Sequence, residues 1–77
     1  MEVLIVRLPM YHSAGDEAAF FGWLKRIRAV ASVSNRGRDL HIQLRAGAVS
    51  RDEFQELRAI FHRYAMDTSG LEAIRQR

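Results

Sequence analysis

The chain has 77 residues and no Cys, and its 12 Lys and Arg against 9 Asp and Glu give a formal net charge of +3. This length predicts one small domain over residues 1–77, of a size that buries only about 60% of its unfolded surface. The lack of Cys excludes disulfides and thiolate metal or redox sites, and we expect a cytoplasmic protein. The longest apolar run, residues 3–6, is too short for a membrane span or a signal-peptide core.

All basic residues except Lys25 are Arg. Arg favours planar, bidentate contacts with carboxylate or phosphate groups. A GC-rich coding sequence produces the same bias, and we favour that explanation. The composition is therefore basic without identifying a ligand.

The first third of the chain predicts a strand and then a helix. Residues 3–8 are mostly apolar, which is typical of a strand flanked on both sides in its sheet, and Pro9 ends it. Ser13 and Asp16 have capping-box spacing, so a helix should begin between them. Its buried stripe is expected to contain Phe20, Phe21, Trp23, Leu24 and Ile27, with Trp23 in the core rather than on a ligand platform.

The middle of the chain predicts a β-hairpin. Residues 37–45 alternate polar and apolar side chains, which indicates a half-buried strand with Leu40, Ile42 and Leu44 toward the core. Residues 29–34 indicate a weaker strand before it. The hairpin turn should lie at residues 35–38, where Gly37 accepts positive φ, and residues 46–48 should close the far end.

The last third predicts a second helix. Ser50 and Glu53 form a capping box, and Val49 and Phe54 occupy the staple positions. The helix should end within residues 66–70 and bury Phe54, Leu57, Ile60, Phe61 and Tyr64. Residues 68–77 predict either a short helical turn or a frayed tail, anchored only by Leu71 and Ile74.

These elements indicate an α+β fold with the order β-α-β-β-α. A right-handed crossover with the third strand between the first two predicts a two-layer sandwich. Its three-stranded antiparallel sheet has the strand order 1-3-2, and both helices cover one face. This layout resembles a ferredoxin-like domain that lacks its last strand, and the resemblance is one of architecture alone.

In this layout two surfaces are candidate binding sites. The first is the end of the domain where the loop after the first strand, the hairpin tip and the end of the second helix should meet. Its candidate partner-binding residues are Tyr11, His12, Arg36, Arg38 and His62. These side chains could bind an anionic ligand or an acidic partner. Alternatively, they are polar only because loop tips are exposed to solvent. Arg63 is better explained by its favourable place at a helix C-terminus.

The second surface is the face of the sheet that the helices leave open. Its expected residues are Val3, Ile5, Arg7, His41, Gln43 and Arg45. An apolar centre with a polar rim is typical of a modest partner interface. A solvated antiparallel sheet also tolerates a few Val and Ile, so both interpretations stay open.

The function that best fits these features is a non-enzymatic protein-interaction module. It would act as a homodimer or on a protein partner, for example as an immunity or antitoxin-type inhibitor, through the open face, the exposed edge of the first strand or the basic loop end. The alternative is weak binding of nucleic acid or another anion. His12 and Ser13 are adjacent but lack an orienting group, and His12, His41 and His62 lack ligand spacing, so we expect no catalytic residues, no metal and no cofactor.

Overall fold

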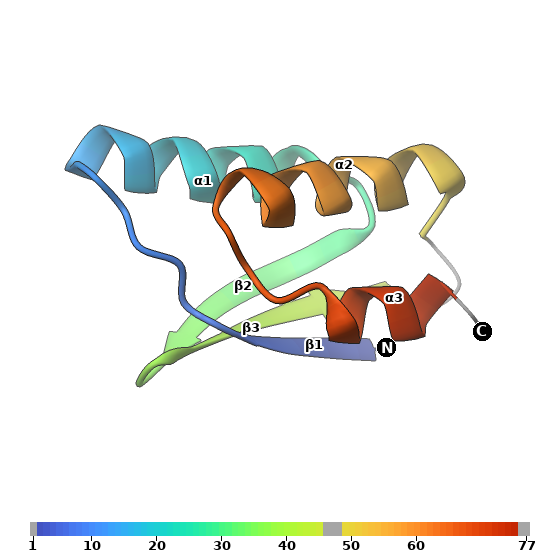
Figure 1. The fold of residues 1–77 in the computed structure, drawn as a ribbon. Helices are drawn as coiled ribbons and strands as arrows, with labels where there is room; N and C mark the ends of the chain where they lie inside the picture. The colour runs from blue at the N-terminus through green and yellow to red at the C-terminus, as the bar shows by residue number, and fades with distance from the viewer. Residues whose placement is uncertain (1, 46–48, 76–77) are drawn as a thin grey trace.

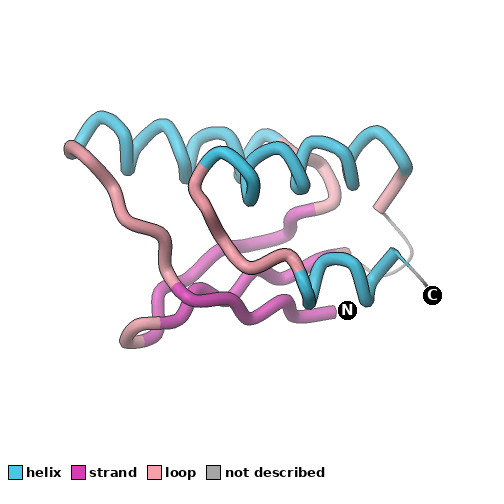
Figure 2. The backbone as a smooth tube through the Cα atoms, viewed as in Figure 1, coloured by secondary structure: helices cyan, strands magenta, loops and turns pink. Residues whose placement is uncertain are grey.

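The computed structural model of the chain describes residues 2–45 and 49–75. Within these residues the elements in chain order are β1 (Glu2–Arg7), α1 (Ala14–Arg26), β2 (Val30–Arg36), β3 (Asp39–Leu44), α2 (Arg51–Arg63) and α3 (Ser69–Arg75). Figure 1 shows α1 and α2 side by side in one layer above the sheet, and Figure 2 shows the same arrangement by element type. The predicted α+β class, element order and two-layer arrangement are confirmed. The turn expected at residues 46–48 lies outside the described residues.

The sheet has the predicted strand order β1-β3-β2, and both pairings are antiparallel. The β2-β3 hairpin is tight, because Arg36 pairs with Asp39 across a two-residue turn in which Gly37 has a φ of 63°. Glycine adopts this conformation without steric cost. β2 therefore runs two residues past the end expected from the sequence. An irregularity between Val30 and Ser32 interrupts the ladder at the other end of the hairpin.

The core lies between the sheet and the helices. The alternation of β3 has the predicted orientation, and Leu40, Ile42 and Leu44 are almost completely buried. The buried residues of the two main helices are Phe20 and Leu24 in α1, and Phe54, Leu57, Ile60 and Phe61 in α2. Of the expected stripe residues, Phe21, Trp23 and Tyr64 are only partly buried and pack against the edge of this core.

Local hydrogen bonds confirm the predicted starts of α1 and α2. Ser13 Oγ accepts from the backbone N–H of Asp16 (3.0 Å). The Asp16 carboxylate in turn accepts from the N–H of His12 (3.0 Å), one residue before the N-cap. At α2 the full capping box forms between Ser50 and Glu53. Each cap satisfies backbone donors that the first helical turn leaves without partners.

α2 ends at Arg63, before the position expected from the sequence. Ala65 has a φ of 56° and donates its N–H to the carbonyl of His62 (3.3 Å), while Met66 donates to the carbonyl of Phe61 (2.8 Å). These two bonds form a Schellman motif, which here has Ala where Gly is usual. The motif reverses the chain so that Met66 returns to the core, where it is 8% exposed.

The tail, for which the sequence left two alternatives open, forms the helix α3. Leu71 is completely buried, and Ile74 packs against the core from the same helix. α3 contacts β1 on the helix side of the sheet, as Figure 1 shows. The contact is close, since a Cβ built on Gly70 would lie 3.0 Å from Leu4 Cδ1.

The structure places β1 at an edge of the sheet, as the predicted strand order requires. The apolar pattern of residues 3–8 taken alone is typical of a strand flanked on both sides, but β1 pairs only with β3 among the described strands. Its alternate residues Leu4 and Val6 face the core, where they are 5% and 8% exposed. Burial in the core thus accounts for Leu4 and Val6. It does not account for the apolar side chains of Val3 and Ile5, which project from the opposite face of β1.

Candidate functional site

The face of the sheet opposite the helices is built from three cross-strand rows. Residues paired across an antiparallel ladder project from the same face, so the register defines these rows. They are Arg7-Asp39-Arg36, Ile5-His41-Ser34 and Val3-Gln43-Ser32. We call these nine residues the open face. Five of the six side chains predicted for this surface, all except Arg45, lie in these rows.

The open face combines an apolar edge with a polar centre. Val3 and Ile5 lie next to each other on β1 and are 47% and 57% exposed. Across the sheet, Ser32 Oγ donates to Gln43 Oε1 (2.8 Å), which holds the polar side chains of β2 and β3 against each other. Formal charge is confined to the row nearest the hairpin turn, where Asp39 lies between two arginines. The surface can therefore bury apolar area and make a few directional polar contacts.

Arg45 does not join the open face. Its Nη1 donates to the carbonyl of Arg28 and to that of Val30 (3.3 Å), so its guanidinium turns toward the end of β2. Both carbonyls lie at the end of the hairpin where the β2-β3 ladder is irregular, and the backbone N–H of Arg45 donates to the carbonyl of Ala29 at the same place. The prediction that Arg45 belongs to the open face is wrong.

The loop end of the domain contains a pocket of about 450 Å³. Its lining residues are Met10, His12, Asp16, Arg63, Tyr64 and Ala65, and we call it the loop-end pocket. The structure thus brings His12 together with the end of α2, as the predicted topology requires. Arg36 and Arg38 lie in the sheet layer at the hairpin tip and do not line this pocket, and His62 does not line it either.

The carboxylate in the loop-end pocket is already satisfied by its own chain. Asp16 accepts from the N–H of His12 (3.0 Å) and from the Tyr64 hydroxyl (3.1 Å). The bond from His12, supported by that from Tyr64, lowers the pKa of Asp16 below its ordinary value. Burial raises the pKa of the Tyr64 hydroxyl, and its bond to Asp16 adds to this effect. The hydrogen bonds of Asp16 therefore link the β1-α1 loop to the end of α2.

Tyr11 is part of the core edge rather than an aromatic surface for a ligand. Its ring centroid lies 5.5 Å from that of Phe20 and 6.5 Å from that of Tyr64. Its hydroxyl oxygen is buried and has no hydrogen-bond partner among the residues that the structure describes. Burial also raises the pKa of this hydroxyl. Tyr11 thus contributes packing where the sequence suggested recognition.

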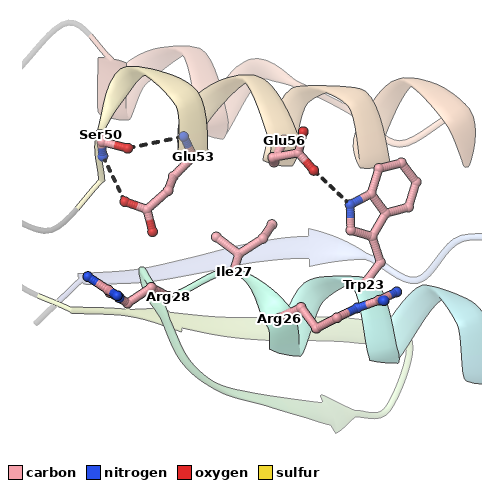
Figure 3. A pocket seen from close by; sticks show the side chains of 7 residues that line it. All are labelled: Trp23, Arg26, Ile27, Arg28, Ser50, Glu53 and Glu56. Carbon is pink, nitrogen blue, oxygen red and sulfur yellow. Dashed lines mark hydrogen bonds between the residues drawn. The ribbon is translucent and has the colours of Figure 1, made fainter.

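A larger groove of about 750 Å³ lies between the end of α1 and the start of α2 (Figure 3). Its polar side chains mainly serve the fold. The Glu53 carboxylate accepts from the N–H of Ser50 (3.3 Å) and from the N–H of Ala29 (2.7 Å), and the Trp23 indole donates to Glu56 Oε1 (3.1 Å). Burial acts to raise the pKa of Glu53, but the hydrogen bonds from Ser50 and Ala29 outweigh it and lower this pKa. The groove is a junction between the two helices.

Sequence reasoning did not find the tertiary roles of these side chains. Glu53 was assigned only to its own helix cap, yet it also accepts from a residue 24 positions earlier. Trp23 bonds a residue 33 positions later. The one signal in the sequence is the indole itself, because a half-buried indole N–H normally needs an acceptor. The sequence does not identify which residue supplies that acceptor.

Within residues 2–45 and 49–75 no group of three or more His, Asp or Glu side chains is arranged to hold a metal ion. Each helix in these ranges is too short or too polar to cross a lipid bilayer. Ser13, the neighbour of His12, is occupied as the N-cap of α1.

Comparison of the chain with known protein families, with curated proteins and with solved structures found no match.

Proposed function

We propose that the chain is a non-enzymatic protein-interaction module whose open face binds a second copy of itself. The observation that carries this proposal is the exposure of Val3 and Ile5, 47% and 57%, on a face that no described helix covers. A small domain gains stability when such apolar side chains are removed from water. We expect the module to act in the cytoplasm, in keeping with a chain that has no Cys.

The charges of the open face permit a second copy as the occupant. The row Arg7-Asp39-Arg36 contains both signs, so a two-fold axis near this row would bring Asp39 of one copy toward an arginine of the other. Stacked sheets lie about 10 Å apart and interdigitate their side chains. The uncharged rows around Ile5 and Val3 introduce no repulsion between formal charges into such a stack.

The size of the face supports a weak dimer. Three strands of six or seven residues, with about 4.8 Å between strands and about 3.3 Å per residue, span roughly 14 by 20 Å. Each partner in a standard stable interface buries about 800 Å², and this footprint is well below that area. We therefore expect a dissociation constant in the micromolar range or weaker, and association only at high protein concentration.

The test is sedimentation equilibrium of the wild type and two variants over a wide concentration range. Ile5→Lys should abolish association while its circular dichroism spectrum stays that of the wild type. Ala59→Lys is the matched control, because Ala59 is exposed on α2 and the charge change is the same. It should dimerise like the wild type. A wild type that remains monomeric at millimolar concentration, or an Ile5→Lys variant that still dimerises, contradicts the proposal.

A further inference from the structure

Each edge strand of the sheet is contacted by one helix, β1 by α3 and β2 by α1. β3 is central, so β1 and β2 each have one side without a paired strand. α3 packs beside β1 and lies against its side chains on the helix side. β2 has no strand on its outer side within the described residues, and Figure 2 shows the strand running along the border of the sheet. The outer edge of β2 is therefore available to a partner strand.

A hollow of about 530 Å³ lies along this edge. Its floor is formed by residues 30–33 of β2 together with Ile27, and its rim carries Lys25, Arg28 and Arg45. No carboxylate is among its lining residues. Arg45 Nη1 donates to the carbonyls of Arg28 and Val30, and a guanidinium carries five N–H donors in all. The hollow thus joins a strand edge to concentrated positive charge.

The floor indicates what kind of anion fits. Ala31 and Val33 are partly exposed, and they give the hollow an apolar strip beside the cations. A phosphate group would make no use of that strip, and no aromatic side chain lines the hollow to stack a base. A second copy of this chain would bring its own three cations to the same place. An extended peptide whose acidic side chains project to the helix side matches both the cations of the hollow and the unpaired edge of β2.

We propose that the outer edge of β2 accepts an acidic, extended segment of a partner protein as a fourth strand. Main-chain hydrogen bonds to β2 provide affinity in this mode of recognition, and alternate side chains provide specificity. The carboxylates lie on the helix side of the added strand, where Lys25 and Arg28 line the hollow. The ladder irregularity between Val30 and Ser32 limits regular pairing to the stretch from Ser32 to Arg36.

The same features discourage unwanted pairing. Positive side chains and bulges protect natural edge strands from joining copies of themselves. Here both protections are present, yet positive charge also attracts a strand of opposite charge. The edge is therefore selective for acidic partners. This inference is independent of the open face, which projects from a different surface of the sheet.

The experiment uses the peptide acetyl-Val-Glu-Val-Glu-Val-Glu-Val-amide and follows the protein by two-dimensional amide NMR, below the concentration at which it associates. The peptide should shift the resonances of Ser32 to Arg36, and amides on this stretch should exchange with deuterium more slowly when it is bound. A peptide with Gln in place of Glu should bind at least about fivefold more weakly, since exposed ion pairs have modest strength.

Four variants separate specific pairing from general attraction. Arg28→Glu should weaken binding of the Glu peptide about tenfold, whereas the matched reversal Arg7→Glu, on the other edge strand, should change it about twofold or less. Asn35→Pro removes a backbone donor from the outer side of β2, because Asn35 alternates with the residues whose N–H groups face β3, and it should abolish the slowed exchange if its circular dichroism shows a folded chain. Ile5→Lys should bind the peptide like the wild type, whatever its oligomeric state.

Several outcomes would overturn the inference. They are no binding of the Glu peptide at millimolar concentration, equal binding of the Gln peptide, and equal losses from Arg28→Glu and Arg7→Glu. Binding without protection of any β2 amide would likewise contradict strand addition. An oligothymidylate that binds at least as tightly as the Glu peptide and shifts the same resonances would show that the hollow attracts polyanions in general.

Discussion

Replacing Glu53 with Ala should destabilise the fold by more than the loss of a helix cap. The carboxylate closes the capping box of α2 and also accepts from the N–H of Ala29 at 2.7 Å. Ala29 is 0% exposed, so its N–H has little access to a replacement water. Leaving a buried donor without a partner costs about 1–3 kcal/mol. Because Glu53 itself is partly exposed and water can enter the groove, we expect a total loss of about 2 kcal/mol.

The assay is thermal and urea unfolding of matched variants. For a domain of this length about 2 kcal/mol corresponds to a fall in Tm of roughly 8–16 °C. Ser50→Ala removes the cap and keeps the acceptor of Ala29, so it should cost about 1 kcal/mol. Glu56→Ala removes the same charge from the exposed side of α2 and loses only the Trp23 contact, and its cost should also be smaller. If Glu53→Ala costs no more than Ser50→Ala, the bond to Ala29 contributes nothing and the reasoning fails.

The pH dependence gives a second measurement of the same interaction. The pKa of Glu53 is lower in the folded chain than its ordinary value, so the folded state binds this proton more weakly than the unfolded state does. The stabilisation is therefore complete above the unfolded pKa of about 4.3 and is lost as the pH falls through the folded pKa. The wild type should lose more stability than Glu53→Gln between about pH 6 and pH 3. Equal losses in the two proteins would contradict this assignment.

Two further predictions concern the loop end of the domain. Tyr64→Phe should cost about 1 kcal/mol in urea unfolding and raise the pKa of Asp16 in NMR titration, because it removes the hydroxyl that donates to this carboxylate. Its matched control, Tyr11→Phe, removes a buried hydroxyl without a partner in the described structure and should be neutral or stabilising. Ala65→Gly should raise stability by about 0.5–1 kcal/mol, since Ala65 has a φ of 56° that glycine adopts without strain. A lower Tm for this variant would show that the Schellman turn is not strained.

Local patterns in the sequence were sufficient to predict most of the fold. The alternation in residues 37–45 identified which side chains of β3 face the core, because successive residues of a strand project to opposite faces. The capping residues Ser13 and Ser50 located both helix starts to within a few residues, since they act on backbone donors of the same turn. The connection rules for antiparallel strands and crossovers then led to the sheet order β1-β3-β2.

What the sequence could not determine depends on contacts between distant residues. The apolar pattern of β1 alone resembles that of a central strand, and only the structure shows that α3 packs beside this edge strand. Arg45 follows the alternation of the open face in sequence, yet its guanidinium turns to two carbonyls at the end of β2. The tertiary structure also determined that Glu53 accepts a hydrogen bond from the N–H of Ala29 and that Tyr11 packs at the edge of the core. In each case the partner is set by three-dimensional proximity, which periodicity and capping signals do not contain.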